Sequence, residues 1–224
     1  MDPEQWTAVD RYLTDLVVRP DAALQAALES STAAGLPAIH VAPNQGKLLF
    51  LLAQIQGARN ILEIGTLGGY SAIWMARALA PGGRLITLES DPAHADVARE
   101  NIARAGLADV VEIRIGPALE TLPRLAREGQ AFDLIFIDAD KESYPDYFTW
   151  SLNLSHRGSL IIVDNVVRKG AILNPPAGDQ VLQAVRRFLE MLATEPRVNV
   201  TVIQTVGSKG YDGLAIARVV GDVS

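Results

Sequence analysis

The chain of 224 residues contains no cysteine, which excludes disulfide bonds and thiolate metal sites. Its 3 histidines, His40, His94 and His156, are scattered and lack the spacing of a metal-binding cluster. Positive charge is also scarce, because 20 basic residues face 26 acidic ones and the formal net charge is −6. General nucleic-acid binding, which needs a basic surface, is therefore not expected.

Long hydrophobic runs are missing as well. The longest runs, such as residues 48–53, are far too short to span a bilayer. The first residues show neither the basic region nor the apolar stretch of a signal peptide. We therefore expect a cytoplasmic protein with no membrane partner. Because 49% of the residues are hydrophobic, the length and composition suit a single α/β domain over residues 1–224.

Helical and strand patterns alternate along the chain. Apolar residues at helical spacing predict helices near residues 3–18, 21–34, 44–56, 70–79, 92–105, 117–128, 144–153 and 178–193. Short apolar runs predict strands near residues 60–64, 84–89, 110–115, 132–138, 159–164, 198–205 and 213–220. Right-handed βα units then give a Rossmann-like, doubly wound sheet of seven strands. We expect it to be mostly parallel, with an antiparallel C-terminal strand and helices on both faces. Asn44 is expected to cap the third helix.

Acidic residues lie at the ends of three of the predicted strands. Glu63 is the penultimate residue of the first, Asp138 ends the fourth, and Asp164 ends the fifth. In open α/β sheets the ligand crevice lies beyond the carboxyl ends of the strands. Because buried strand ends do not normally collect charge, this pattern predicts a site for a cationic ligand.

A glycine-rich turn follows the first strand, with glycines at positions 65, 68 and 69. This spacing differs from the G-x-G-x-x-G of dinucleotide-binding proteins. Glu89 ends the second strand, where an acid can accept both ribose hydroxyls of a nucleoside. Alternatively, Glu89 and Asp91 only cap the next helix. Asp91, which precedes a proline, is the better cap, so we favour ribose binding for Glu89.

These features favour S-adenosylmethionine (SAM) over NAD as the cofactor. The sulfonium and ammonium groups of SAM are positive, and an acidic crevice attracts them. The same crevice would repel the pyrophosphate of NAD.

Asp138, Asp164 and Asn165 follow two strands that we expect to be neighbours. Adjacent strands lie ~5 Å apart, so these side chains can converge on one ion. Carboxylate and amide oxygens suit Mg²⁺, with Mn²⁺ or Ca²⁺ as alternatives. The competing interpretation is that Asp138 is a helix cap and Asp164 belongs to a simple turn. Lys141 would lie beside the ion and the sulfonium, whose positive charge favours the neutral amine and makes it a usable base.

Several motifs carry a family resemblance. They are L-E-I-G-T-L-G-G-Y-S at residues 62–71, I-T-L-E at 86–89, G-P-A-L at 116–119, F-I-D-A-D-K at 136–141 and V-D-N at 163–165. Together they resemble the cation-dependent class I O-methyltransferases, which include caffeoyl-CoA and catechol O-methyltransferases. The D-A-D-K stretch is most similar to the caffeoyl-CoA branch and its bacterial relatives. The resemblance covers the chain from about residue 36 to the C-terminus.

This resemblance implies roles for individual residues. Lys141 and Asp138 would be catalytic, and the metal ligands would be Asp138, Asp164 and Asn165. The cofactor contacts would be Val41, Glu63, Gly65, Thr66, Ser71, Glu89, Ala118 and Asp138. His40 receives no role. The stretch 168–179 is interpreted as a loop of the site but matches nothing of known function.

We therefore expect a metal-dependent O-methyltransferase that methylates a hydroxyl of a small, catechol-like phenol. A homodimer is expected, and the helices of residues 1–57 would cover the cofactor and substrate and contribute dimer contacts. Three alternatives remain at this point. They are a metal-independent class I methyltransferase acting on another small molecule, an NAD(P)-linked oxidoreductase, and a non-catalytic nucleoside-binding protein.

Overall fold

A seven-stranded sheet organises the chain, with strand order β3-β2-β1-β4-β5-β7-β6. The computed structural model describes residues 2–19 and 21–221; the other residues of the predicted domain, 1, 20 and 222–224, lie outside the described residues. The strands are β1 (Asn60–Ile64), β2 (Arg84–Glu89), β3 (Val111–Ile115), β4 (Phe132–Ile137), β5 (Ser155–Val163), β6 (Val198–Gly207) and β7 (Gly210–Val219). Strands β1 to β5 are parallel, and β7 runs antiparallel to both β5 and β6. The predicted doubly wound, mostly parallel sheet is confirmed.

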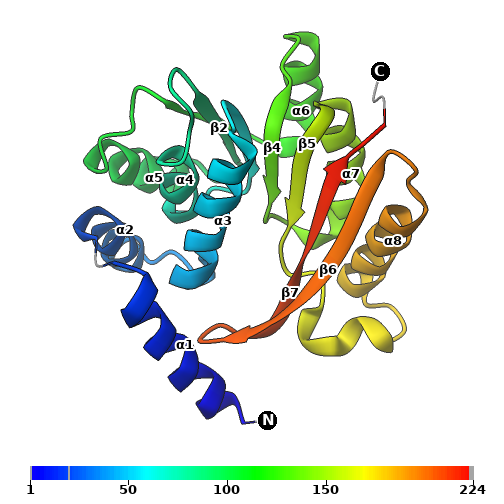
Figure 1. Cartoon of the computed structure of the whole chain (residues 1–224), viewed down its shortest axis with the longest axis horizontal. Coiled ribbons are helices and arrows are strands. Elements are labelled where there is room, and N and C mark those ends of the chain that lie inside the picture. The colour runs from blue at the N-terminus through cyan, green and yellow to red at the C-terminus, as the bar shows by residue number, and fades with distance from the viewer. Residues whose placement is uncertain (1, 20, 222–224) are drawn as a thin grey trace.

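Helices cover both faces of this sheet (Figure 1). They are α1 (Pro3–Val17), α2 (Ala22–Ala33), α3 (Pro43–Gln56), α4 (Tyr70–Ala76), α5 (Pro92–Arg104), α6 (Ala118–Arg127), α7 (Tyr144–Asn153) and α8 (Gln180–Thr194), with 3-10 turns at Lys141–Ser143 and Arg168–Leu173. Among the described residues, no helix is long and apolar enough to cross a membrane.

Two hydrophobic cores lie on opposite faces of the sheet. Leu62 and Ile64 of β1 pack with residues of α6, α7 and α8, whereas Ile61 packs with residues of α2, α3, α4 and α5. Burial on both faces explains why the central strands read as continuous apolar runs rather than as an alternating pattern.

Some boundaries differ from the sequence prediction. Strand β5 begins at Ser155, before the predicted residue 159, because a polar first part pairs with β4 across a register shift. Gly158, with φ +101°, lies in this irregular part. Helix α3 is preceded by Ala42 as its N-cap, so the prediction that Asn44 caps it is wrong. Pro43 at the first helical position already starts the helix there.

The N-terminal helix is tied to the far end of the chain. Helix α1 has no buried residue and lies beside the β6–β7 hairpin (Figure 1). The Asp10 carboxylate accepts hydrogen bonds from the Ser208 backbone N–H (2.8 Å) and from the Asn44 side chain (2.8 Å). Asp10, a partly exposed acid, therefore joins α1 to α3 and to the C-terminal hairpin.

Candidate active site

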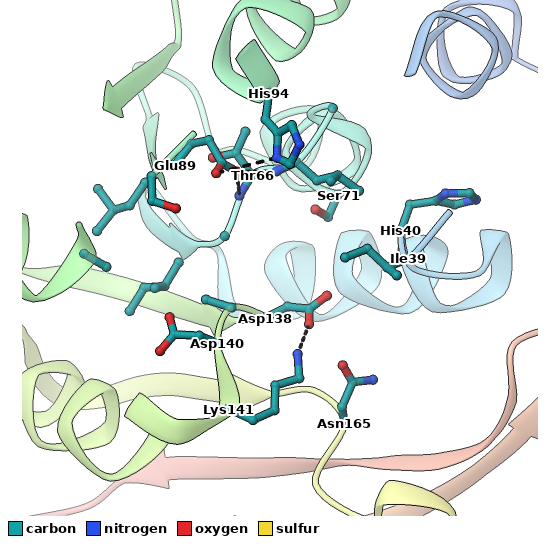
Figure 2. A pocket seen from close by; sticks show the side chains of 18 of the residues that line it. Ile39, His40, Thr66, Ser71, Glu89, His94, Asp138, Asp140, Lys141 and Asn165 are labelled. Atoms are coloured by element: carbon teal, nitrogen blue, oxygen red, sulfur yellow. Dashed lines mark hydrogen bonds and ion pairs between the residues drawn. The ribbon is translucent and has the colours of Figure 1, made fainter. Parts of the chain in front are cut away.

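A cavity of about 690 Å³ opens at the carboxyl ends of β1, β2, β4 and β5 (Figure 2). This is the edge of the sheet at which the sequence predicts the ligand. Seven of the eight predicted cofactor-binding residues line it, namely Val41, Gly65, Thr66, Ser71, Glu89, Ala118 and Asp138. Glu63 lies behind the wall, without solvent exposure.

Gly65 lets two loops of the site approach each other. It has φ +98°, and a Cβ at this position would lie 2.1 Å from the carbonyl oxygen of Asp138. No other residue type fits without moving one of the two loops. The turn after β1 and the turn after β4 are therefore held in direct backbone contact.

Glu63 is the centre of a buried hydrogen-bond network. Its carboxylate accepts from Ser71 Oγ at 2.5 Å and from Thr87 Oγ1 at 2.6 Å. Thr87 Oγ1 is in turn 2.5 Å from Thr66 Oγ1. Burial, with smaller contributions from the Asp138 and Glu89 carboxylates, raises the pKa of Glu63 to about 8, although the hydrogen bonds from Ser71 and Thr87 act in the opposite direction. Ser71, which lines the cavity, is fixed by this network.

Glu89 lies at the end of β2 with only 8% of its surface exposed. One carboxylate oxygen accepts from the Leu67 N–H (2.8 Å) and the Thr66 N–H (3.3 Å), and the other from the Asp91 N–H (3.0 Å). Asp91 accepts from Ala93 and caps α5, as expected. Glu89 is therefore not the helix cap, and its carboxylate is held in place at the cavity wall.

Asp138 and Lys141 form an ion pair on the opposite side of the cavity. Lys141 Nζ lies 2.9 Å from Asp138 Oδ1, and the side chain of Asn165 lines the same cavity (Figure 2). The Lys141 ammonium also lies 5.5 Å from the centre of the Tyr144 ring. The Tyr144 hydroxyl donates to the Asp164 carbonyl oxygen (2.8 Å), so the turns after β4 and β5 are connected.

Asp164 is almost fully buried, with 5% exposure. Burial raises its pKa to about 7, and the negative charge of Asp138 contributes in the same direction. Asp138 and Asn165 line the cavity, whereas Asp164, which directly follows β5 in the chain, does not line it. Asn165 follows with φ +55°, a left-handed conformation that asparagine tolerates better than most residues.

The metal site predicted from the sequence includes only two acidic side chains, Asp138 and Asp164. Within residues 2–19 and 21–221, no group of three or more His, Cys, Asp or Glu side chains is placed to hold a metal ion. The predicted ligand set differs from such a group because it combines two carboxylates with the amide of Asn165.

Other residues at the cavity carry no recognisable sequence signal. His94 lies 3.8 Å from both Glu89 and Asp91. His40 lines the cavity and packs edge-on against Tyr70, and burial lowers its pKa. Arg168, from the stretch without an assigned role, also lines it.

Gln45 also carries no signal in the sequence. Its Nε2 donates to Asp164 Oδ2 at 2.6 Å across a separation of 119 residues. Only the packing of α3 against the sheet brings these two residues together.

The chain is similar to known proteins over nearly its whole length. A family model described as "O-methyltransferase" matches residues 18–220. A relative named catechol O-methyltransferase, from Niastella koreensis, is 54% identical over 220 residues, covering 98% of this chain and 100% of the relative. The structure of the O-methyltransferase from Bacillus cereus in complex with SAH has a TM-score of 0.96 and 55% identity, covering 97% of this chain and 100% of that one. The O-methyltransferase TomG from Streptomyces achromogenes, solved with SAM, has a TM-score of 0.95 and 50% identity, covering 99% of this chain and 100% of that one.

These similarities agree with the motifs at the strand ends and extend over nearly the whole chain. They remove the NAD(P)-linked oxidoreductase and the non-catalytic binding protein as alternatives. The chain belongs to the O-methyltransferase family and is an O-methyltransferase, as its motifs predicted.

Proposed function

We propose that this protein transfers the methyl group of SAM to a hydroxyl of a small, catechol-like phenol and requires a divalent cation. The observation that carries this proposal is the cavity at the carboxyl ends of the strands, which suits a cofactor and a small acceptor and which Asp138, Lys141 and Asn165 line, with the buried Asp164 next to Asn165 in the chain. A 54% identical relative bears the name catechol O-methyltransferase, and two similar structures contain SAH or SAM.

The residues at the ends of β4 and β5 fit a divalent cation. Asp164 is buried, and the negative charge of Asp138 raises the cost of ionising it unless a positive charge lies nearby. The structure gives Asp138 one counter-ion, the Lys141 ammonium at 2.9 Å. Asp138, Asp164 and Asn165 would hold Mg²⁺ with oxygen ligands, and Mn²⁺ or Ca²⁺ could take the same donors.

The pKa of a phenol in water is about 10, so deprotonating it at pH 7 costs about 4 kcal/mol. A divalent cation would supply the positive charge that lowers this pKa. Lys141 would no longer be needed as the counter-ion of Asp138, and its neutral Nζ would accept the proton of the acceptor hydroxyl. The phenolate oxygen would then attack the methyl carbon in line with the departing sulfur. The site residues contribute chiefly by placing these atoms and excluding water.

The cofactor would lie along the opposite wall. Glu89 would accept the ribose hydroxyls with the lone pairs that its three backbone donors leave free. Ser71, held by Glu63, and the backbone near Val41 would contact the methionine part, with Gly65 and Thr66 below it. Ala118, at the start of α6, would contact the adenosine part.

We further propose that the chain forms one domain in which the helices of residues 1–57 cover the site. Val41 and His40, between α2 and α3, already line the cavity. A homodimer and a cytoplasmic location stay predictions. The exposed apolar side chains of β6, including Val202 (43%) and Val206 (49%), support the homodimer.

An assay with labelled SAM and a panel of diphenols tests the proposed reaction. We expect vicinal diphenols to be methylated, a strong chelator to abolish turnover, and added Mg²⁺ to restore it. Asp164→Asn should lower turnover at least a hundredfold, since it removes one of the two charges that would hold the ion, whereas the exposed Asp109→Asn should not. Full turnover in chelator would favour the metal-independent alternative.

A further inference from the structure

Gln45 is a side chain whose contact the proposed chemistry leaves unexplained. Asp164 receives one hydrogen bond on each carboxylate oxygen. The Asn165 backbone N–H donates to Oδ1 at 2.7 Å, and Gln45 Nε2 donates to Oδ2 at 2.6 Å. A carboxylate oxygen has two lone pairs, so each oxygen keeps one free for a further partner. The two donors fix the direction in which these free lone pairs point.

The position of Gln45 is set by both of its neighbours in the sequence. On one side, Asn44 Nδ2 donates to Asp10 Oδ1 and Thr14 Oγ1, both at 2.8 Å, which binds the start of α3 to α1. On the other side, a Cβ at Gly46 would lie 2.4 Å from the Trp74 ring, so α3 packs against α4 in close contact. Because these contacts already fix its backbone, Gln45 loses little further conformational entropy when it bonds to Asp164.

The chemical type of this donor is informative. A lysine or arginine in the same place would neutralise Asp164 and repel a dication. The glutamine amide is neutral, so it orients the carboxylate and leaves its negative charge for another cation. Partners of this kind, which hold a metal ligand without touching the metal, typically change metal affinity by about 10- to 100-fold when removed.

We infer that Gln45 is a positioning residue of the divalent-cation site, acting by holding the Asp164 carboxylate in its ligating orientation. This inference rests on the proposed function, because it assumes that Asp164 is a metal ligand. It extends the site to helix α3 and to a residue outside the motifs of the family resemblance.

The test measures binding of Mn²⁺ to the full-length protein by calorimetry, without turnover. Gln45→Met conserves volume but removes the donor, and we expect Mn²⁺ affinity to fall about 10- to 100-fold. SAM affinity should stay within about twofold. In steady-state assays, the Mg²⁺ concentration that gives the half-maximal rate should rise by a larger factor than the factor by which kcat falls. The matched control is Gln54→Met, an exposed glutamine on the same helix, which should bind Mn²⁺ like the wild type.

Unchanged Mn²⁺ affinity of Gln45→Met would overturn the inference while leaving the metal site itself in place. Failure of the wild type to bind Mn²⁺ would contradict the proposed metal dependence, and the inference with it. If Gln45→Met does not fold, Gln45→Ala decides the question. Alanine suits a helix and removes the donor without adding charge, so we expect it to weaken Mn²⁺ binding too, and wild-type affinity in this variant would overturn the inference.

Discussion

Glu63 and Asp164 are buried carboxylates held by hydrogen bonds instead of by basic side chains. Ser71 and Thr87 donate to Glu63, and Gln45 and the Asn165 backbone donate to Asp164. Neutral donors orient a carboxylate but compensate only part of its desolvation. Both acids therefore keep raised pKa values.

The raised pKa of Glu63 makes stability depend on pH. Its pKa rises from 4.5 to about 8 on folding, so the folded chain holds a proton that the unfolded chain releases. The stabilising contribution is complete below pH 4.5 and is lost as the pH rises toward 8, by up to about 1.4 kcal/mol per pH unit. We expect Glu63→Gln, which mimics the protonated form, to reduce this loss.

Chemical denaturation of the cofactor-free protein at several pH values between 5 and 8 measures the effect. The difference in unfolding free energy between wild type and Glu63→Gln should shift in favour of the variant as the pH rises. Glu100→Gln, at an exposed position, should follow the wild type at every pH. A constant difference across the range would show that Glu63 titrates normally.

At the scale of elements, the site depends on the contact between the turn after β1 and the turn after β4. These strands are neighbours in the sheet, paired from Ile61 with Leu134 to Ile64 with Ile137. Their register brings Gly65 against the Asp138 carbonyl. Gly65 therefore connects the turn after β1, where we propose that SAM binds, to the turn after β4, which carries the proposed metal ligand Asp138.

Gly65→Ala should disturb both sides of the site. Alanine adds backbone strain of about 1–3 kcal/mol at φ +98° and also meets the Asp138 carbonyl oxygen. We expect a lower melting temperature and at least tenfold weaker SAM binding by calorimetry. Gly129→Ala is the matched control, because φ is +69° there but nothing lies within 4 Å of the new Cβ. If both variants bind SAM equally well, the close contact has no role in the site.

At the scale of the whole molecule, the sheet has an exposed edge. Strand β6 is the last of the order and has 10 residues, with Val200, Val202, Ile203 and Val206 between 38% and 49% exposed. Long apolar edge strands usually become covered by another chain or are protected by charge. Helix α1 adds Tyr12 (65% exposed) and Leu16 (63%) beside the same edge.

We expect the protein to be a homodimer in solution and Val202→Lys to shift it to the monomer, because a lysine on an edge strand opposes pairing. Light scattering coupled to size-exclusion chromatography measures the mass directly. Asp109→Lys, just before β3 at the opposite edge of the sheet, should remain dimeric. A monomeric wild type would contradict the predicted dimer.

The sequence by itself determined the elements and the ends of the strands. Apolar periodicity is local, so most helices and strands could be predicted within a few residues, and the acids at residues 63, 89, 138 and 164 were found because each follows or ends such a run. The polar start of β5 was missed for the same reason, since its pairing with β4 leaves no apolar pattern.

Only the tertiary structure decided which side chains meet. Gln45 reaches Asp164 across 119 residues, and Asp10 joins Asn44 to Ser208 across the full length of the chain. These contacts depend on how α3 packs against α4 and on where the β6–β7 hairpin ends. Local patterns report which face of an element is buried, whereas the partner on that face is set by the close packing of the whole chain.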